Sequence, residues 1–214
     1  MSTEKMAIFD LDGTLNDVIS YAIDAFYMAM ETEQIESNIT REQVISMFGA
    51  PWHIIAKTAF PNILPAQIKR FNDVIDKYEF ELIKERGRTF PGTVESLQKL
   101  RDNGYVIVVC SNAKINYIDK VSESIKIDHL IDYKQELHNG FIKNDMVKLI
   151  LDKFQPKKAI MVGDRFYDKD AAKSNNIPFI GCLYGCAPDE MIDAEYKIES
   201  ATEIADMVMD ILEK

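Results

Sequence analysis

Short apolar runs, separated by helical patterns, recur through the second half of the chain. The runs at residues 105–112, 158–164 and 177–185 are strongly apolar, the first rich in β-branched residues, which predicts buried strands. Residues 5–10 form a similar run near the other end of the chain. Because such runs alternate with helical patterns, the sequence predicts βαβ units and a doubly wound, Rossmann-like α/β domain with a parallel sheet.

Shorter elements complete this predicted domain. Two more short strands are expected, one within residues 129–137 and one at 196–198. Helices are expected at residues 93–102, 114–124, 144–154, 167–174 and 202–212. The first of these helices should stop at Asn103 and Gly104, since this pair favours a chain reversal.

The segment from residue 16 to residue 87 differs, because nearly all of it has a helical pattern. Helices are expected at residues 17–33, 40–49, 51–60 and 65–85. Thr40 followed by Gln43 is typical of a capping box. The chain leaves the strand domain at about residue 16 and returns at about residue 88, so the two linkers should run side by side. The sequence therefore predicts a core of residues 1–15 and 88–214 and an inserted helical cap of residues 16–87.

Composition narrows the possible partners and compartment. The 214 residues are 47% hydrophobic and 28% charged, which is ordinary for a soluble globular protein. A net charge of -10 without a basic run argues against nucleic acid as a partner. The N-terminus lacks a signal-peptide pattern and no apolar run is long enough to span a membrane. The three cysteines, one of them within a predicted strand, indicate reduced thiols and a cytoplasmic protein.

Polar residues follow the predicted strands at their carboxyl ends, where an open parallel sheet binds its ligands. Grouped by strand, they are Asp10, Asp12, Gly13 and Thr14; Ser111 and Asn112; and Gly163, Asp164 and Asp168. Lys143 begins the helix that precedes the last of these strands. An Asp-x-Asp-Gly sequence also occurs in calcium loops, but the further acidic ligands of an EF-hand are missing here. The pattern favours one polar site assembled from three strands.

This set of residues resembles the four motifs of the haloacid dehalogenase superfamily, a large group of mostly phosphate-ester hydrolases. The DxDGT signature runs from Asp10 to Thr14, and the second and third motifs match Ser111 and Lys143. The fourth motif, GDxxxD, is residues 163–168. The resemblance covers nearly the whole chain, and the helical insertion looks like the C1 cap of the superfamily. The sequences "FPG" and "GDRFYD" are similar to the phosphoglycolate phosphatase-like branch.

The resemblance implies a Mg²⁺-dependent phosphatase that acts on a small phosphorylated metabolite. Asp10 would be the nucleophile that forms an aspartyl-phosphate, and Asp12 the general acid and base. Ser111 and Lys143 would bind and neutralise the phosphoryl group. Phosphate binding would extend to Gly13, Thr14 and Asn112. The metal ligands would be Asp10, the backbone carbonyl of Asp12, Asp164 and, directly or through water, Asp168.

Some of these residues also have a plainer interpretation. Ser111 alone could be a helix cap, and Asp170 lies close to Asp168 in the fourth motif. Asp17 could be an acidic residue at a helix start or a hinge residue beside the cap. Trp52 fits core packing of the cap better than contact with substrate.

Other activities stay open at this stage. A β-phosphoglucomutase-like sugar phosphomutase would share every core motif, so it is the nearest alternative. A phosphonatase would need a cap lysine as a Schiff base, and Lys57 is the candidate. A non-catalytic binding protein with the same fold is a third possibility. Either a monomer or a homodimer would suit all of these.

Overall fold

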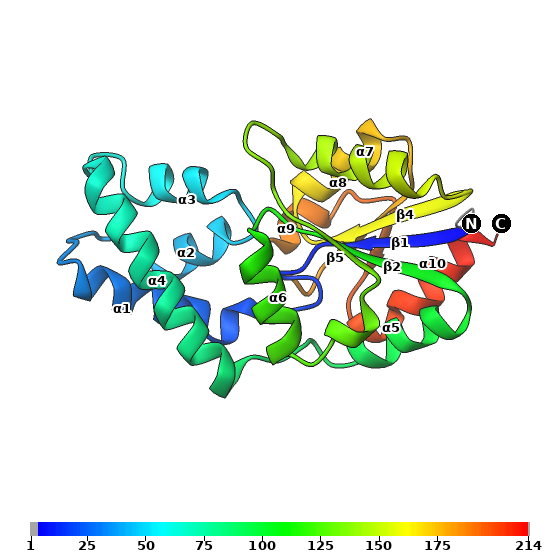
Figure 1. Ribbon diagram of the computed structural model, residues 1–214, viewed down its shortest axis with the longest axis horizontal. Coiled ribbons are helices and arrows are strands. Elements are labelled where there is room, and N and C mark those ends of the chain that lie inside the picture. Colours follow the sequence, from blue (N-terminus) through cyan, green and yellow to red (C-terminus); the bar gives the residue numbers. More distant parts are fainter. Residues whose placement is uncertain (1–3, 214) are drawn as a thin grey trace.

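A six-stranded parallel sheet forms the centre of one half of the molecule (Figure 1). The computed structural model describes residues 4–213. The strands lie in the order β3-β2-β1-β4-β5-β6. Their bounds are β1 Lys5–Phe9, β2 Tyr105–Cys110, β3 Tyr133–Gln135, β4 Lys158–Gly163, β5 Phe179–Cys182 and β6 Tyr196–Ile198. All five neighbouring pairs are parallel, which confirms the predicted α/β class.

Helices cover both faces of this sheet because its central strand is apolar on both sides. Met6 and Ile8 of β1 pack in one buried cluster, and Ala7 and Phe9 pack in another on the opposite face. The first cluster includes α7 (Lys143–Phe154) and α8 (Phe166–Ser174), and the second includes α5 (Thr93–Asp102), α6 (Ile115–Ser124) and α10 (Ile204–Leu212). The core is therefore doubly wound, as predicted.

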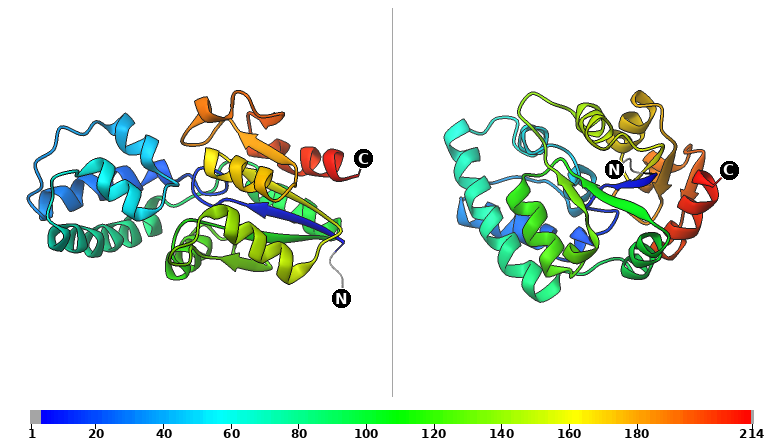
Figure 2. Two further views of the ribbon diagram at one scale, coloured as in Figure 1. Left: turned by 90° about the horizontal axis from the view of Figure 1, so that it is seen from above. Right: turned by 45° about the vertical axis from the view of Figure 1, so that its right-hand side comes forward.

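Four helices lie together beyond one edge of this core, at the left of Figure 1 and in the left view of Figure 2. They are α1 (Ala22–Thr32), α2 (Arg41–Met47), α3 (Trp52–Ala59) and α4 (Pro65–Arg86). The ring of Phe71 lies 5.2 Å from that of Phe26 and 5.0 Å from that of Phe60, measured between centroids. These aromatic contacts hold α1, α3 and α4 together. The expected capping box at the start of α2 is present.

The two linkers between these helices and the core lie side by side. Asn16 and Thr89 form an antiparallel bridge, and the amide of Asp17 donates to the carbonyl of Arg88 at 3.0 Å. The side chains of Asp17 and Arg88 also pair, with 2.7 Å between Oδ2 and Nη2. Asp17 caps no helix with its side chain, so the structure favours its interpretation as a residue of the linker pair.

A few elements differ from the sequence prediction. The helix expected at residues 17–33 is divided, with a 3₁₀ turn at Val18–Ser20 before α1 begins. The strand expected at 177–185 is shorter, and the single-turn helix α9 (Pro188–Met191) that follows it was not predicted. Such short elements contain too few residues to show a periodic pattern. The three cysteines are free thiols, as expected.

Candidate active site

The predicted site residues meet where the strand order of the sheet reverses. Phe9, the last residue of β1, lies in register with Val109 of β2 and Val162 of β4. Asp10, Ser111 and Asp164 therefore leave the sheet close together just beyond these strands. At such a switch point the loops diverge and leave a crevice that can hold a ligand.

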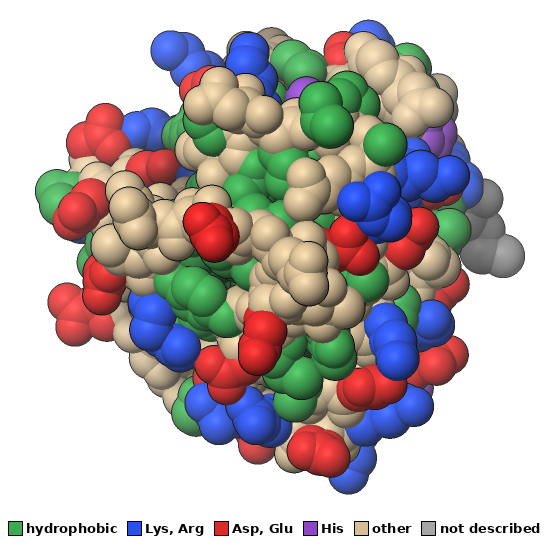
Figure 3. All heavy atoms as spheres, turned by 90° about the vertical axis from the view of Figure 1, so that its left-hand side faces the viewer, with side chains coloured by type: hydrophobic (Ala, Val, Ile, Leu, Met, Phe, Trp, Pro, Cys, Tyr) green, Lys and Arg blue, Asp and Glu red, His purple; other side chains and the backbone are tan. Residues whose placement is uncertain are grey.

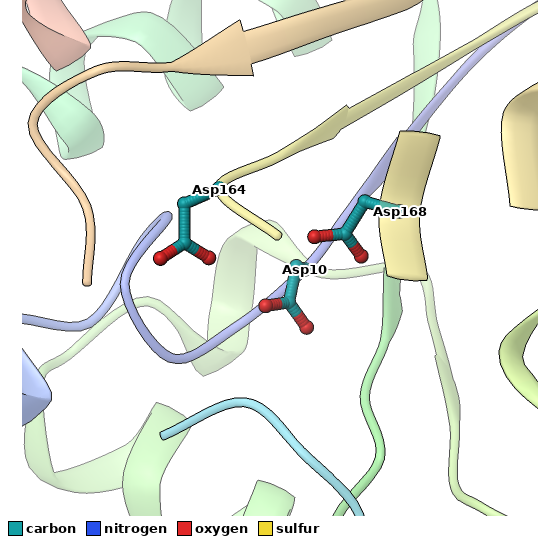
Figure 4. A group of neighbouring side chains, drawn as sticks. All are labelled: Asp10, Asp164 and Asp168. Atoms are coloured by element: carbon teal, nitrogen blue, oxygen red, sulfur yellow. The ribbon is translucent and has the colours of Figure 1, made fainter. Parts of the chain in front are cut away.

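Three carboxylates converge in this crevice. Ligand oxygens of Asp10, Asp164 and Asp168 all lie within 4.8 Å of one another, and Figure 4 shows the side chains directed toward a common point. None of the three residues is more than 3% exposed. The ammonium of Lys143, at the start of α7, lies 2.6 Å from Oδ1 of Asp10 and 2.5 Å from Oδ1 of Asp168. Four residues that are far apart in the sequence thus form one buried charged cluster.

Burial and crowding shift the pKa of several groups in this cluster. Burial, with the nearby charges of Asp10 and Asp168, raises the pKa of Asp164 well above its usual value. Burial raises the pKa of Asp168 to about 7, although Lys143 opposes this shift. Burial alone would lower the pKa of Lys143, but the two carboxylates beside it raise the pKa overall, so the ammonium stays charged. The one ammonium therefore pairs with two of the three carboxyl groups, and Asp164 is left without a cationic partner in the cluster.

The cluster has the chemistry of a divalent cation site. Within residues 4–213, Oδ2 of Asp10 is buried and has no hydrogen-bond partner. Leaving a buried carboxylate oxygen without a partner is costly unless a cation approaches it. Oxygen ligands of this kind suit a hard divalent ion, and Asp10, Asp164 and Asp168 would hold it.

Asp12 lies in a different environment from Asp10. It is half-buried and its Oδ1 accepts hydrogen bonds from Nδ2 of Asn16 at 2.6 Å and from the hydroxyl of Tyr117 at 3.2 Å. Burial, and to a lesser extent the charge of Asp10, raises the pKa of Asp12 to about 7, although these hydrogen bonds act in the opposite direction. Its side chain lines a cavity rather than joining the three-carboxylate cluster. Asp12 can therefore exchange a proton near neutral pH.

The other predicted phosphate-binding residues make contacts within the protein. Ser111 lines the same cavity, and its Oγ accepts a hydrogen bond from the amide of Ala113 at 3.1 Å. Nδ2 of Asn112 donates to the carbonyl of Gly49 at 2.8 Å, which links the core to the loop after α2. The hydroxyl of Thr14 lies 3.5 Å from Oδ1 of Asp164. Phosphate binding by Ser111, Asn112 and Thr14 stays a prediction.

Gly13 lets the loop after β1 pass close to the carboxylate cluster. Its φ is +85°, a conformation that side chains of L-residues rarely adopt. A Cβ atom at this position would lie 2.2 Å from Oδ2 of Asp164. The glycine is therefore required both by the turn and by the close approach of Asp164.

Some ambiguous residues can now be placed. Asp168 is buried in the cluster, whereas Asp170 is exposed. The ring of Trp52 stacks on that of Phe71 at 5.9 Å and also lines the cavity, so packing and access to a ligand are compatible. Lys57 is exposed on α3 and is not among the residues lining the cavity, so nothing supports a Schiff base there.

Three partners of the acidic residues were missed by sequence reasoning. Asn16 and Tyr117 bind Asp12, and the amide of Cys186 donates to Oδ2 of Asp164 at 2.7 Å. Asn16 could have been noticed, because it lies just after the Asp-x-Asp-Gly-Thr sequence. No local signal marks Tyr117 or Cys186, since only the fold brings them to the site.

Comparison with known proteins agrees with this geometry. Residues 7–182 match the profile of the family described as Haloacid dehalogenase-like hydrolase. The chain belongs to this family. The match confirms the resemblance noted from the motifs, and this haloacid dehalogenase-like hydrolase is therefore an enzyme of hydrolytic type.

Individual relatives are similar over most of their length. The chain is 27% identical to a phosphoglycolate phosphatase of Haemophilus influenzae (strain 86-028NP) over 205 residues, covering 86% of this chain and 88% of the relative. It is also 24% identical over 209 residues to a protein of Caldanaerobacter subterraneus subsp. tengcongensis that is provisionally named pyrophosphatase PpaX. This match covers 94% of this chain and 93% of the relative. The crystal structure of a predicted phosphoglycolate phosphatase from Haemophilus somnus 129pt superposes with a TM-score of 0.87 at 20% identity, covering 97% and 99%.

Two further observations concern membrane-spanning helices and the charge of the surface. Within residues 4–213, no helix is long and apolar enough to cross a membrane. Figure 3 shows the face of the molecule on the side of α1–α4, where acidic and basic side chains are interspersed and no basic patch stands out.

We expect the variant Gly13→Ala to damage the site of this hydrolase. The added methyl group would force Asp164 to move and would strain the loop, so unfolding in urea should show a loss of about 2 kcal/mol or more. Gly104→Ala is the matched control, because Gly104 also has a positive φ of +79° but nothing within 4 Å of the added atom. It should lose only about 1 kcal/mol. Equal losses in the two variants would contradict the close approach of Asp164.

Addition of Mg²⁺ should stabilise the folded hydrolase, because the ion would offset the repulsion among three buried carboxylates. At a concentration about 100 times the Kd, the gain is about 2.7 kcal/mol, which raises Tm by roughly 5 °C or more. Asp164→Asn should abolish most of this shift in a thermal denaturation assay. Asp170→Asn, on the exposed side of α8, should keep it. A full shift in Asp164→Asn would rule out the cluster as the binding site.

Proposed function

We propose that this hydrolase is a Mg²⁺-dependent phosphatase that cleaves a small phosphate monoester through an aspartyl-phosphate on Asp10. The observation that carries the proposal is the contrast between Asp10 and Asp12. Asp10 is paired with Lys143 at 2.6 Å, which holds its carboxylate in place beside a positive charge. Burial raises the pKa of Asp12 to about 7, which allows it to hold a proton for the leaving group.

In the first step, a carboxylate oxygen of Asp10 attacks phosphorus. The new P–O bond forms as the bond to the leaving oxygen breaks, and Asp12 gives its proton to that oxygen. The product alcohol leaves, and Asp10 carries the phosphoryl group as a mixed anhydride. Lys143 stabilises the negative charge of the phosphoryl oxygens, and Ser111 supplies a hydroxyl donor at the edge of the cavity.

In the second step, Asp12 acts as a base. It takes a proton from water as the water oxygen attacks phosphorus, and the bond between phosphorus and Asp10 breaks. Inorganic phosphate leaves, Asp10 is free again, and Asp12 is protonated for the next cycle. Mg²⁺ held by Asp10, Asp164 and Asp168, with the backbone carbonyl of Asp12 as a further ligand, would neutralise the repulsion between phosphate and carboxylate.

The contacts between cap and core support a closed active site during these steps. Nη1 of Arg165 donates to the carbonyl of Phe48, and Arg165 is held in turn by Glu190, with 3.1 Å between Nε and Oε2. Asn112 holds the neighbouring carbonyl of Gly49. Residues 16–87 would thus act as a cap that closes over the substrate and excludes water other than the reactant.

Phosphoglycolate is the first ester to test, because relatives of this chain carry that name. A sugar phosphomutase with the same core remains the alternative, and it would transfer the phosphoryl group back to a sugar instead of to water. Release of inorganic phosphate separates the two activities.

The variant Asp10→Asn should lose phosphatase activity, because an amide cannot form the acyl phosphate. Wild-type protein should release inorganic phosphate from at least one member of a panel of phosphate monoesters with Mg²⁺, and EDTA should stop the reaction. The variant should be slower by at least about a thousandfold.

Asp170→Asn is the control for this experiment, since its side chain is exposed and outside the cluster. It should retain the wild-type rate. Retention of the rate by Asp10→Asn, or turnover that continues in EDTA, would refute the proposed mechanism.

A further inference from the structure

The cavity beside the proposed reaction centre has an acidic wall that faces the leaving group. We propose, on the basis of the proposed function, that Asp76 and Glu79 of α4 select a leaving group with hydrogen-bond donors and no negative charge. An alcohol with a free hydroxyl or an ammonium group meets this description. A carboxylate-bearing alcohol such as glycolate does not.

The position of the cavity indicates what occupies it. It has a volume of about 840 Å³ and lies between core and cap, with Asp12, Ser111 and Tyr117 on the core side and Asp76 and Glu79 on the cap side. Asp12 is the residue proposed to protonate the leaving oxygen. The carbon chain attached to that oxygen must therefore extend into this cavity, which is large enough for a small metabolite.

The cap contributes two carboxyl groups to this cavity. Asp76 and Glu79 lie three residues apart on α4, so they share one face of the helix. Both are half-buried, and within residues 4–213 neither side chain forms a hydrogen bond or an ion pair with another residue. Burial, followed by the charges of Asp12 and Asp76, raises the pKa of Glu79 well above its usual value. A donor from a ligand would satisfy these oxygens.

Few positively charged side chains line the cavity beside Asp76 and Glu79. Among the described residues lining the cavity there is no arginine, and the one lysine, Lys114, donates its ammonium to the carbonyl of Leu137 at 2.7 Å. Lys120 acts on Asp76 by its charge but is not a lining residue, and its ammonium lies 3.6 Å from the centre of the Phe80 ring.

The remaining titratable groups on the cavity wall are two histidines. His53 comes from α3, and His138 comes from the loop after β3. Three carboxyl groups therefore line the cavity, from Asp12, Asp76 and Glu79.

These carboxyl groups discriminate between leaving groups of equal size. A carboxylate placed in the cavity would lose its hydration and meet Asp76 and Glu79 instead of a free cation, which is unfavourable. A hydroxyl or ammonium group would donate to the same oxygens, and carboxylates are strong acceptors. The aromatic rings of Trp52 and Tyr117 also line the cavity and would favour an ammonium further.

Three two-carbon phosphate esters test the inference: phosphoglycolate, 2-hydroxyethyl phosphate and phosphoethanolamine. They have similar size but carry a carboxylate, a hydroxyl and an ammonium at the far end. We expect kcat/KM for phosphoglycolate to be lower than for the better of the other two by at least about tenfold. The order of the hydroxyl and ammonium esters shows which donor the cavity prefers.

Glu79→Gln tests the residue itself, because it keeps the shape of the side chain and replaces the carboxyl group by an amide. The ratio of kcat/KM between the preferred ester and phosphoglycolate should fall by about fivefold or more. Asp76→Asn should also lower this ratio. It replaces Glu79→Gln as the test if that variant folds poorly. Glu81→Gln, on the exposed face of α4, is the matched control and should keep the wild-type ratio.

The outcomes separate this inference from the proposed function. Wild-type protein that prefers phosphoglycolate, or a ratio that neither variant changes, would overturn the acidic-wall inference and leave the phosphatase proposal in place. Wild-type protein that releases no phosphate from any ester would overturn both.

Discussion

The structure depends most on the buried contact between Lys143 and the carboxylates of Asp10 and Asp168. Removing charges from water is costly, so a buried ion pair needs good geometry and further partners to persist. Here the pair is part of a larger cluster, because Asp164 adds a third carboxyl group and Lys143 is in contact with only two of the three. The carboxyl ends of β1 and β4 thus place oxygens that could hold a cation, and in the proposed function that cation would prepare the site for a phosphate dianion.

Topology explains how this arrangement arises from separate parts of the chain. The strands β1 and β4 lie next to each other, and the loops that follow them diverge, which places Asp10 and Asp164 on the two sides of one crevice. The first turns of α7 and α8 supply Lys143 and Asp168. Because the scaffold is rigid and apolar on both faces of the sheet, it can keep four charged groups together.

The cap provides what the core lacks. In the proposed mechanism the core would bind the phosphoryl group and move protons, and the leaving group would extend into the cavity lined by residues of α3 and α4. Paired linkers at Asn16 and Thr89 give the cap two adjacent connections, which suits a hinge. In this proposal the core residues carry the chemistry, and Asp76 and Glu79 of α4 select the leaving group.

The sequence predicted the core more fully than the surroundings of the site. The strands β1, β2 and β4 were found because each is a continuous apolar run, and Asp10, Asp164 and Lys143 because they match spaced motifs at strand or helix ends. The partners of Asp12 and Asp164 were not predicted, since Tyr117 and Cys186 reach the site only through tertiary packing.

Glu79 is another residue whose position at the site could not be predicted from the sequence. In the sequence it is one acidic residue of an amphipathic helix, and nothing distinguishes it from Asp73 or Glu81. Only the packing of α4 against the core shows that it lies on the cavity wall.

Detection of the phosphorylated enzyme tests the central claim most directly. Wild type and Asp12→Asn would be mixed with the best substrate and Mg²⁺, quenched with acid within milliseconds to seconds, and examined by peptide mass spectrometry. The account predicts a phosphoryl group on Asp10 that accumulates more in Asp12→Asn, because the variant lacks the base for hydrolysis. A phosphoryl group on another residue, or none on Asp10 while phosphate is being released, would contradict the account.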